Sequence, residues 1–123
     1  MKNAATALIV DDSPSMRLVL RITLQNAGYE VTEASNGREA LASAARQKFD
    51  FVITDLNMPE MDGVELVKAL RADSSYRFTP ILTLTNANAE LKKQQVRDAG
   101  ATGWIQKPFE PGSLVNVLNK VAA

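Results

Sequence analysis

Short apolar runs alternate with amphipathic stretches along the whole chain. Most of the runs are rich in β-branched residues and apolar throughout, which is typical of strands that are covered on both faces. We predict five strands, at residues 6–10, 30–34, 50–54, 80–84 and 103–106. The second run alternates apolar with polar residues, and we therefore expect it at an edge of the sheet.

The stretches between these runs carry apolar residues at helical spacing. The first helix is predicted to begin after Ser13-Pro14, a pair typical of an N-cap and a first helical turn, and to end before Gly28. Four further helices are predicted at about 37–47, from about 62 to 70, at 88–99 and from 114 to 121. The fourth of the five is mostly polar, and its Lys92 and Lys93 are typical of a solvated helix face.

The alternation of strands and helices predicts the fold class. Such a pattern favours βαβ units with a parallel sheet, and right-handed crossovers place the helices on both faces. We predict an α/β protein of the flavodoxin-like type, a doubly wound five-stranded parallel sheet with strand order 2-1-3-4-5. No linker, repeat or low-complexity stretch interrupts the pattern, so residues 1–123 are predicted to form a single domain.

The composition excludes several classes of function. Lys and Arg number 14 and Asp and Glu number 14, so no net positive charge favours nucleic acid or an anionic membrane. The absence of Cys and His excludes disulfides, zinc sites with thiolate or imidazole ligands, and a Ser-His-Asp triad. Because no apolar run could span a bilayer and the first residues lack the pattern of a signal peptide, we expect a cytoplasmic protein without a membrane partner.

Side chains that can bind a metal ion or take part in a reaction follow four of the five apolar runs. They are, in chain order, Asp11, Asp12, Asp55, Thr85 and Lys107. The carboxyl ends of parallel strands meet at one edge of the sheet, so we expect these side chains to lie together there. Crowded carboxylates repel each other unless a cation binds them, and Mg²⁺ prefers oxygen ligands. The sequence therefore predicts a Mg²⁺ site formed by the acidic residues.

Phosphoryl transfer is the chemistry that such a group of residues suggests. A carboxylate can attack phosphorus and form an aspartyl phosphate, and Asp55 is the best acceptor because it stands alone beside the Asp11-Asp12 pair. Thr85 would donate a hydrogen bond to a phosphoryl oxygen, and Lys107 would supply a positive charge to another. Neither GxxxxGK[ST] nor GxGxxG is present, so no nucleotide or dinucleotide cofactor is expected.

Taken as a set, these motifs resemble those of response-regulator receiver domains. The resemblance rests on Asp11-Asp12-Ser13, the segment 55–63, Thr85 and Lys107-Pro108-Phe109, and it covers essentially the whole chain. It implies one receiver domain over residues 1–123 that belongs to a two-component system, with Asp55 phosphorylated by a histidine kinase. It also implies a set of Mg²⁺ ligands: Asp12 and Asp55 through carboxylates, Asn57 through its carbonyl, and Asp11 through water.

Within that family the chain is similar to single-domain CheY-like chemotaxis proteins, in particular to those that carry Trp before the lysine, here Trp104. The likeness implies that Thr85 and Trp104 form a switch that responds to phosphorylation. It also implies partners: a CheA-like histidine kinase or a phosphotransfer domain, and a flagellar motor switch or a phosphatase bound through the fourth helix, fifth strand and fifth helix. Such a protein is no enzyme beyond its own phosphorylation and dephosphorylation. Asn86 departs from the small residue common after the threonine, and we expect it to narrow access to Asp55.

Other functions remain open at this point. Within the family, the alternatives are a phosphate sink, a phosphorelay intermediate and a regulator of pilus motility. A different class is a phosphatase of the haloacid dehalogenase type that uses Asp and Mg²⁺, although such enzymes carry Asp where this chain has Asn57. A flavin-binding module is a third class, which no aromatic-rich loop supports.

Each site residue also has a structural explanation. Asp11 and Asp12 would favour the positive end of the first helix as caps. Asp55 would be a loop acid, Thr85 an ordinary threonine at a strand end, Lys107 a member of a structural ion pair, and Trp104 a packing residue.

Overall fold

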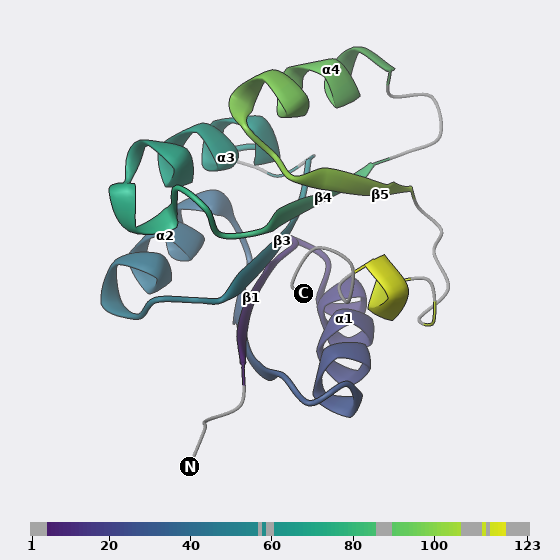
Figure 1. The fold of residues 1–123 in the computed structure, drawn as a ribbon. Helices are drawn as coiled ribbons and strands as arrows, with labels where there is room; N and C mark the ends of the chain where they lie inside the picture. The colour runs from purple at the N-terminus through teal and green to yellow at the C-terminus, as the bar shows by residue number, and fades with distance from the viewer. Residues whose placement is uncertain are drawn as a thin grey trace.

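Five parallel strands form one sheet in the order β2-β1-β3-β4-β5 (Figure 1). The structure, a computed structural model, describes residues 5–56, 58, 61–85, 90–106, 112 and 114–117. The strands are β1 Thr6–Val10, β2 Glu30–Ala34, β3 Phe51–Asp55, β4 Ile81–Thr85 and β5 Gly103–Gln106. Every neighbouring pair is parallel, so the predicted fold class and strand order are confirmed.

The helices connect successive strands. They are α1 Pro14–Asn26, α2 Gly37–Arg46, α3 Gly63–Ala72 and α4 Glu90–Ala99, and residues 114–117 are also helical. The start of the predicted fourth helix at 88–89, and Leu118 and Val121 of the predicted last one, lie outside the described residues. In the part of the chain that the structure describes, no helix has the length and the apolar character needed to cross a membrane.

Side-chain caps fix where three of these helices begin. The Ser13, Asn36 and Asp62 side chains accept hydrogen bonds from the backbone of the first turns of α1, α2 and α3. Asp62 also forms a reciprocal capping box with Glu65. Gly28 follows α1 with a φ of 97°, a conformation that favours glycine, so the predicted end of this helix is confirmed.

Two hydrophobic cores lie on opposite faces of the sheet, because successive strand residues point to opposite sides. Leu8 and Val10 of β1 pack in the core that includes residues of α2 and α3. Ala7 and Ile9 pack in the core that includes Leu20 of α1 and Leu114. The sheet is thus covered on both faces, as Figure 1 shows. Ala34 is the one buried residue of β2, in agreement with the predicted position of this strand at an edge of the sheet.

Two strands end one residue later than predicted. Asp55 is the last residue of β3 and Thr85 the last residue of β4, whereas the sequence placed both just beyond a strand. Their backbones still pair in the ladder, since Asp55 aligns with Leu84 and Thr85 with Gln106. A short 3₁₀ helix, η1 Ser74–Tyr76, was not predicted, because three residues are too few to show a helical period.

Candidate functional site

Three carboxylates meet at the carboxyl edge of the sheet. One oxygen from each of Asp11, Asp12 and Asp55 lies within 4.8 Å of the other two. Strand pairing explains this proximity: Val10 of β1 aligns with Thr54 of β3, and Asp11 and Asp55 are the residues that follow these two in the chain. Asp11 is 1% exposed and Asp55 is 6% exposed, whereas Asp12 is open to solvent. The site therefore combines two buried carboxylates with one exposed carboxylate.

Hydrogen bonds fix Asp11 at the start of α1. Its Oδ1 atom accepts a hydrogen bond from the Ser13 backbone N–H at 2.9 Å, and its own N–H donates to the Ala34 carbonyl of β2 at 3.1 Å. The Arg17 guanidinium donates to the Asp11 carbonyl at 2.7 Å and forms an ion pair with Glu33 at 3.3 Å. Arg17 thus ties α1 and β2 to the acidic site. Sequence reasoning missed it, because its partner Glu33 lies on the next strand and no local motif links the two residues.

The Asp55 side chain is held by the backbone that follows it. Asp55 Oδ1 accepts a hydrogen bond from the Leu56 N–H at 2.9 Å. The Leu56 carbonyl in turn accepts from the Gly63 N–H at 3.0 Å, which closes the loop before α3. These bonds orient one carboxylate oxygen from within the chain and connect the start of α3 directly to the acceptor candidate.

Of the other predicted site residues, Thr85 is described by the structure, and Lys107, Asn57 and Asn86 are not. Thr85 is 3% exposed at the end of β4, one residue beyond the position that pairs with Asp55. It therefore lies on the side of β3 opposite to β1 and its acidic pair. Lys107, Asn57 and Asn86 lie outside the described residues, so their expected roles stay predictions.

Trp104 lies on β5, and two cations of α4 lie near its ring. The Lys93 ammonium is 5.6 Å and the Arg97 guanidinium carbon 5.3 Å from the ring centroid, within the range of cation–π attraction. Lys93 is partly buried, so the helix face that was predicted to be solvated also makes a contact at this position. The reason is that the long alkyl chain of lysine can cover an aromatic surface while its charge stays near water. The two contacts join α4 to the edge strand.

The donor set suits a small, hard cation. Mg²⁺ binds oxygen ligands at about 2.1 Å, so ligands on opposite sides of the ion lie about 4.2 Å apart. Carboxylate oxygens within 4.8 Å of each other are close to that spacing, and water or phosphate oxygens usually complete the shell. Asp11, Asp12 and Asp55 therefore satisfy the chemistry and approximate spacing of a Mg²⁺ site, and their role as ligands stays a prediction.

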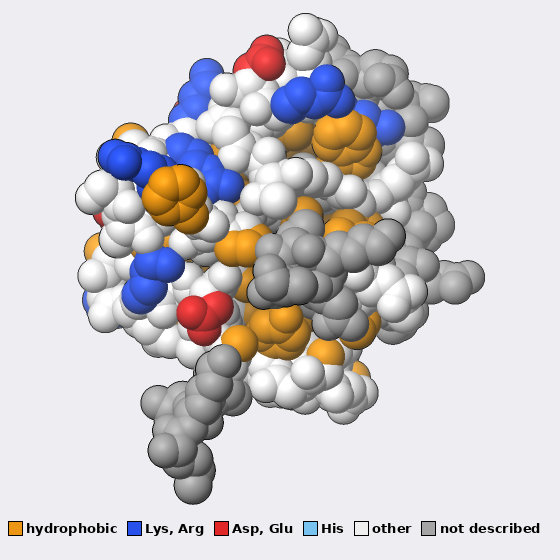
Figure 2. All heavy atoms as spheres, viewed as in Figure 1, with side chains coloured by type: hydrophobic (Ala, Val, Ile, Leu, Met, Phe, Trp, Pro, Cys, Tyr) orange, Lys and Arg blue, Asp and Glu red, His pale blue; other side chains and the backbone are white. Residues whose placement is uncertain are grey.

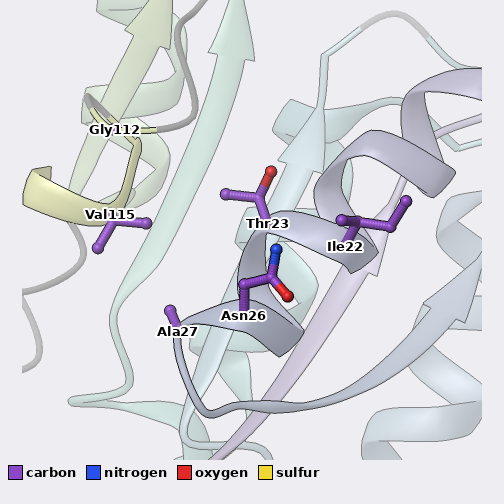
Figure 3. A pocket seen from close by; sticks show the side chains of 6 residues that line it. All are labelled: Ile22, Thr23, Asn26, Ala27, Gly112 and Val115. Atoms are coloured by element: carbon purple, nitrogen blue, oxygen red, sulfur yellow. The ribbon is translucent and has the colours of Figure 1, made fainter.

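A hollow of about 350 Å³ lies between α1 and the segment that contains Gly112 and Val115 (Figure 3). The α1 side chains around it are Ile22, Thr23, Asn26 and Ala27. None of these described lining residues is ionisable, so they offer no carboxylate to accept a phosphoryl group or to neutralise a metal ion. The acidic cluster is the better candidate for the functional site.

Comparison with known proteins agrees with this geometry. The response regulator receiver domain family matches residues 7–119. The chain is 41% identical over 118 residues to the chemotaxis protein CheY-3 of Vibrio cholerae, covering 93% of this chain and 88% of that protein. The structure of Vibrio cholerae CheY4 is 52% identical, with a TM-score of 0.92 over 96% of this chain and 98% of the other.

A third relative is the receiver domain of the sensor histidine kinase PA1611 of Pseudomonas aeruginosa, described with a magnesium ion coordinated in its active-site cleft. It is 29% identical, with a TM-score of 0.90 over 97% of this chain and 98% of that chain. The matched family spans nearly all of the sequence, and the strand order, the acidic cluster and the likeness to CheY proteins all agree with it. The chain therefore belongs to the response regulator receiver domain family.

Proposed function

We propose that this protein is a phospho-accepting response regulator of a two-component system, in which Asp55 receives the phosphoryl group. The observation that carries the proposal is the acidic cluster, in which three carboxylates approach within 4.8 Å at the carboxyl edge of the sheet. Such a cluster lowers the stability of the fold through charge repulsion, unless a cation is bound. In a member of the receiver family, the presence of such a destabilising cluster is best explained by a phosphoryl-transfer site that binds a metal.

The metal would be Mg²⁺. Asp12 and Asp55 would hold it through carboxylates, Asn57 through its backbone carbonyl, and Asp11 through water. When bound, Mg²⁺ would neutralise negative charge on the phosphoryl oxygens. The magnesium ion described for the Pseudomonas aeruginosa receiver supports this assignment.

Phosphoryl transfer would be carried out by Asp55 itself. A carboxylate oxygen of Asp55 attacks the phosphorus of a phosphohistidine on the kinase, and the P–O bond forms as the P–N bond breaks. The imidazole nitrogen leaves with the electron pair. In hydrolysis, water attacks the same phosphorus, the P–O bond to Asp55 breaks, and the products are phosphate and the free carboxylate. The protein would thus catalyse only its own phosphorylation and dephosphorylation.

The position of Asp55 within the sheet supports its role as acceptor. β3 lies between β1, which leads into Asp11 and Asp12, and β4, which ends at Thr85. A phosphoryl group on Asp55 would have the acidic pair on one side and the Thr85 hydroxyl on the other. Lys107 would add a positive charge, which strengthens hydrogen bonds to phosphate oxygens.

Chemotaxis is the proposed cellular process, because the similar proteins named above include CheY proteins. The phosphoryl donor would be a CheA-like histidine kinase or a phosphotransfer domain in the cytoplasm. The α4–β5 face, together with the last helix, would bind a motor switch protein or a phosphatase, and phosphorylation would change that affinity only if the partner prefers one state. Pull-down of partners with and without beryllofluoride separates the alternatives. Capture of a motor switch protein in the presence of beryllofluoride would support motor control. Capture of kinases or phosphotransferases alone would support a phosphate sink or a phosphorelay.

Intact-mass measurement after incubation with acetyl phosphate and Mg²⁺ tests the proposal. We expect one added phosphoryl group on the wild type and none on Asp55→Asn. A matched control is Asp73→Asn, since Asp73 lies before η1, at the opposite end of β4 from Thr85. Phosphorylation of Asp55→Asn, or none on the wild type, would contradict the proposal. Steady turnover of small phosphate esters would instead favour the phosphatase class.

A further inference from the structure

Arg17 of α1 places a largely buried cation beside the acidic cluster. Its Nη1 atom donates to the Asp11 carbonyl at 2.7 Å, and its Nε atom donates to the Glu33 carboxylate at 3.3 Å. The Arg17 side chain is 19% exposed, whereas Figure 2 shows Lys and Arg side chains that stand out on the viewed face. Withdrawal of a charged group from water is costly unless its partners compensate, so the two contacts of this guanidinium are what its placement serves.

The acceptor on Asp11 is the carbonyl of the peptide group that joins Asp11 to Asp12. A peptide group is planar, so a hydrogen bond that fixes its carbonyl fixes the orientation of the whole group. The Asp11 N–H donates to the Ala34 carbonyl, and its carboxylate accepts from the Ser13 N–H. Asp12 is exposed, so packing does little to direct it. The orientation of this peptide group therefore sets where the Asp12 side chain begins relative to Asp11.

Helical geometry brings Arg17 to this carbonyl. The Arg17 backbone N–H donates to the Ser13 carbonyl at 3.0 Å, in the first turn of α1. Side chains of a helix point back toward its N-terminus, so a residue one turn into α1 can reach the residues that precede the helix. The Glu33 carboxylate of β2 binds the same guanidinium, and this second contact limits how far it can rotate.

The charge of Arg17, taken by itself, opposes a cation site. A guanidinium beside the acidic cluster repels Mg²⁺, so loss of its charge alone would tighten Mg²⁺ binding. Glu33 offsets part of this charge, and it also accepts a hydrogen bond from Arg21 at 2.6 Å. Charge and position therefore predict changes of opposite sign in Mg²⁺ affinity when Arg17 is replaced.

We propose that Arg17 is a positioning residue of the Mg²⁺ site, which acts through the Asp11 carbonyl to set the spacing of the Asp11 and Asp12 carboxylates. Mg²⁺ demands a nearly ideal octahedral arrangement, so its affinity is sensitive to small shifts of its ligands. Replacement of a residue that orients metal ligands typically weakens binding by about ten- to hundredfold. This role rests on the proposed function, because it concerns the same Mg²⁺ site.

Metal affinity of the folded protein tests this role without a phosphorylation step. Free Mn²⁺, an ion that prefers the same oxygen ligands, is measured by electron paramagnetic resonance, and its displacement by Mg²⁺ gives the dissociation constants of both ions. We expect Arg17→Met to weaken the binding of both ions about tenfold. Met keeps a long side chain and a high helix propensity, so α1 should still form.

Arg21→Met is the matched control, because it removes an arginine from the same helix and an ion pair with the same Glu33. The described hydrogen bond of the Arg21 side chain leads to Glu33 and not to Asp11. Since this pair is more exposed, we expect Mg²⁺ affinity within about twofold of the wild type. The proposal is overturned if Arg17→Met binds Mg²⁺ as tightly as the wild type or more tightly, or if Arg21→Met weakens the binding equally.

The Mg²⁺ dependence of phosphorylation gives a second readout. With acetyl phosphate, Arg17→Met should need about tenfold more Mg²⁺ for half of its maximal rate, and its rate at saturating Mg²⁺ should stay within about threefold of the wild type. A lower saturated rate with an unchanged Mg²⁺ requirement would show that Arg17 does not act through the metal ligands. Melting temperatures in EDTA show whether the variants are folded during the titration.

Arg17→Lys takes the place of Arg17→Met if the latter is unfolded. It keeps the charge and replaces the forked donor by a single nitrogen, so Mg²⁺ binding should weaken about threefold, and an unchanged affinity would overturn the proposal.

Failure of this role and failure of the proposed function give different results. Metal binding that depends on Arg17, in a protein that acetyl phosphate does not phosphorylate, would support the positioning role and contradict the proposed function. Mg²⁺-dependent phosphorylation with a metal affinity that is indifferent to Arg17 would do the reverse. Failure of the wild type to bind either ion would overturn both.

Discussion

Gly63 lies so close to Asp55 that a Cβ atom on Gly63 would be 2.5 Å from the Asp55 carbonyl oxygen and 2.8 Å from the Cα atom of Leu56. Neither backbone atom can move without shifting the acceptor. The first residue of α3 therefore packs directly on the segment that carries the Asp55 carboxylate. This contact explains why a residue without a side chain is required where the loop after β3 enters the helix.

Gly63→Ala should consequently disturb phosphorylation. We expect the rate with acetyl phosphate and Mg²⁺ to fall about tenfold or more, because a displacement of about 1 Å at a reacting group is costly, and the free energy of unfolding to fall by about 1–3 kcal/mol. Gly112→Ala is the control, since a Cβ atom there meets nothing within 4 Å. Equal phosphorylation rates for the two variants would show that the close packing does not position Asp55.

Charge repulsion within the acidic cluster predicts opposite effects of Asp12→Asn without and with Mg²⁺. Removal of one negative charge should raise the melting temperature in EDTA by about 3 °C. The same change removes a predicted ligand, so the rise in melting temperature that Mg²⁺ produces in the wild type should shrink. Thermal unfolding at several Mg²⁺ concentrations measures both effects. The result would argue for a capping role of Asp12 instead if the variant melts at a lower temperature than the wild type in EDTA and its melting temperature rises as much with Mg²⁺.

The two cations near Trp104 suggest a test of whether this residue takes part in the switch. Trp104 is the single tryptophan of the chain, so its fluorescence reports on this position alone, and we expect a change on addition of beryllofluoride and Mg²⁺. Lys93→Met and Arg97→Met together remove two cation–π contacts, of about 0.5–1 kcal/mol each. If these contacts hold the Trp104 ring in the position that it has in the unphosphorylated protein, their removal should favour the other state. The double variant should then reach half of its fluorescence change at a beryllofluoride concentration about fivefold lower than the wild type needs. An unchanged spectrum in the wild type would exclude Trp104 as part of the switch.

Tyr76 gives the protein a pH-dependent stability in the alkaline range. Burial of the phenol raises its pKa from the usual 10.0, and the buried Phe49 N–H donates to its oxygen at 3.2 Å. An acid with a raised pKa in the folded state contributes stability below its unfolded pKa, and this contribution is lost as the pH rises from about 10 through the folded pKa. Tyr76→Phe leaves the Phe49 N–H without this acceptor, which costs about 1–3 kcal/mol at neutral pH.

Urea unfolding between pH 8 and 11 therefore tests the role of Tyr76. The wild type should lose stability more steeply than Tyr76→Phe above about pH 10. Parallel pH profiles, displaced only by a constant difference, would mean that ionisation of Tyr76 does not contribute.

The sequence predicts most of the sheet and much of the acidic cluster, because both depend on local patterns. Apolar runs locate the strands, and the parallel arrangement brings Asp11, Asp12 and Asp55 to one edge. Local patterns do not predict the contacts of Arg17, Arg71 and Lys93. Each of these long side chains reaches residues of other elements, and no local periodicity encodes such partners.

Location of the phosphoryl group within the chain tests the central claim most directly. The phosphorylated protein is reduced with borohydride, which converts an aspartyl phosphate into homoserine, and the modified residue is identified by peptide sequencing in the mass spectrometer. We expect homoserine at residue 55 alone, and only in samples phosphorylated with Mg²⁺ present. Homoserine at residue 11 or 12, or at no position, would contradict Asp55 as the acceptor.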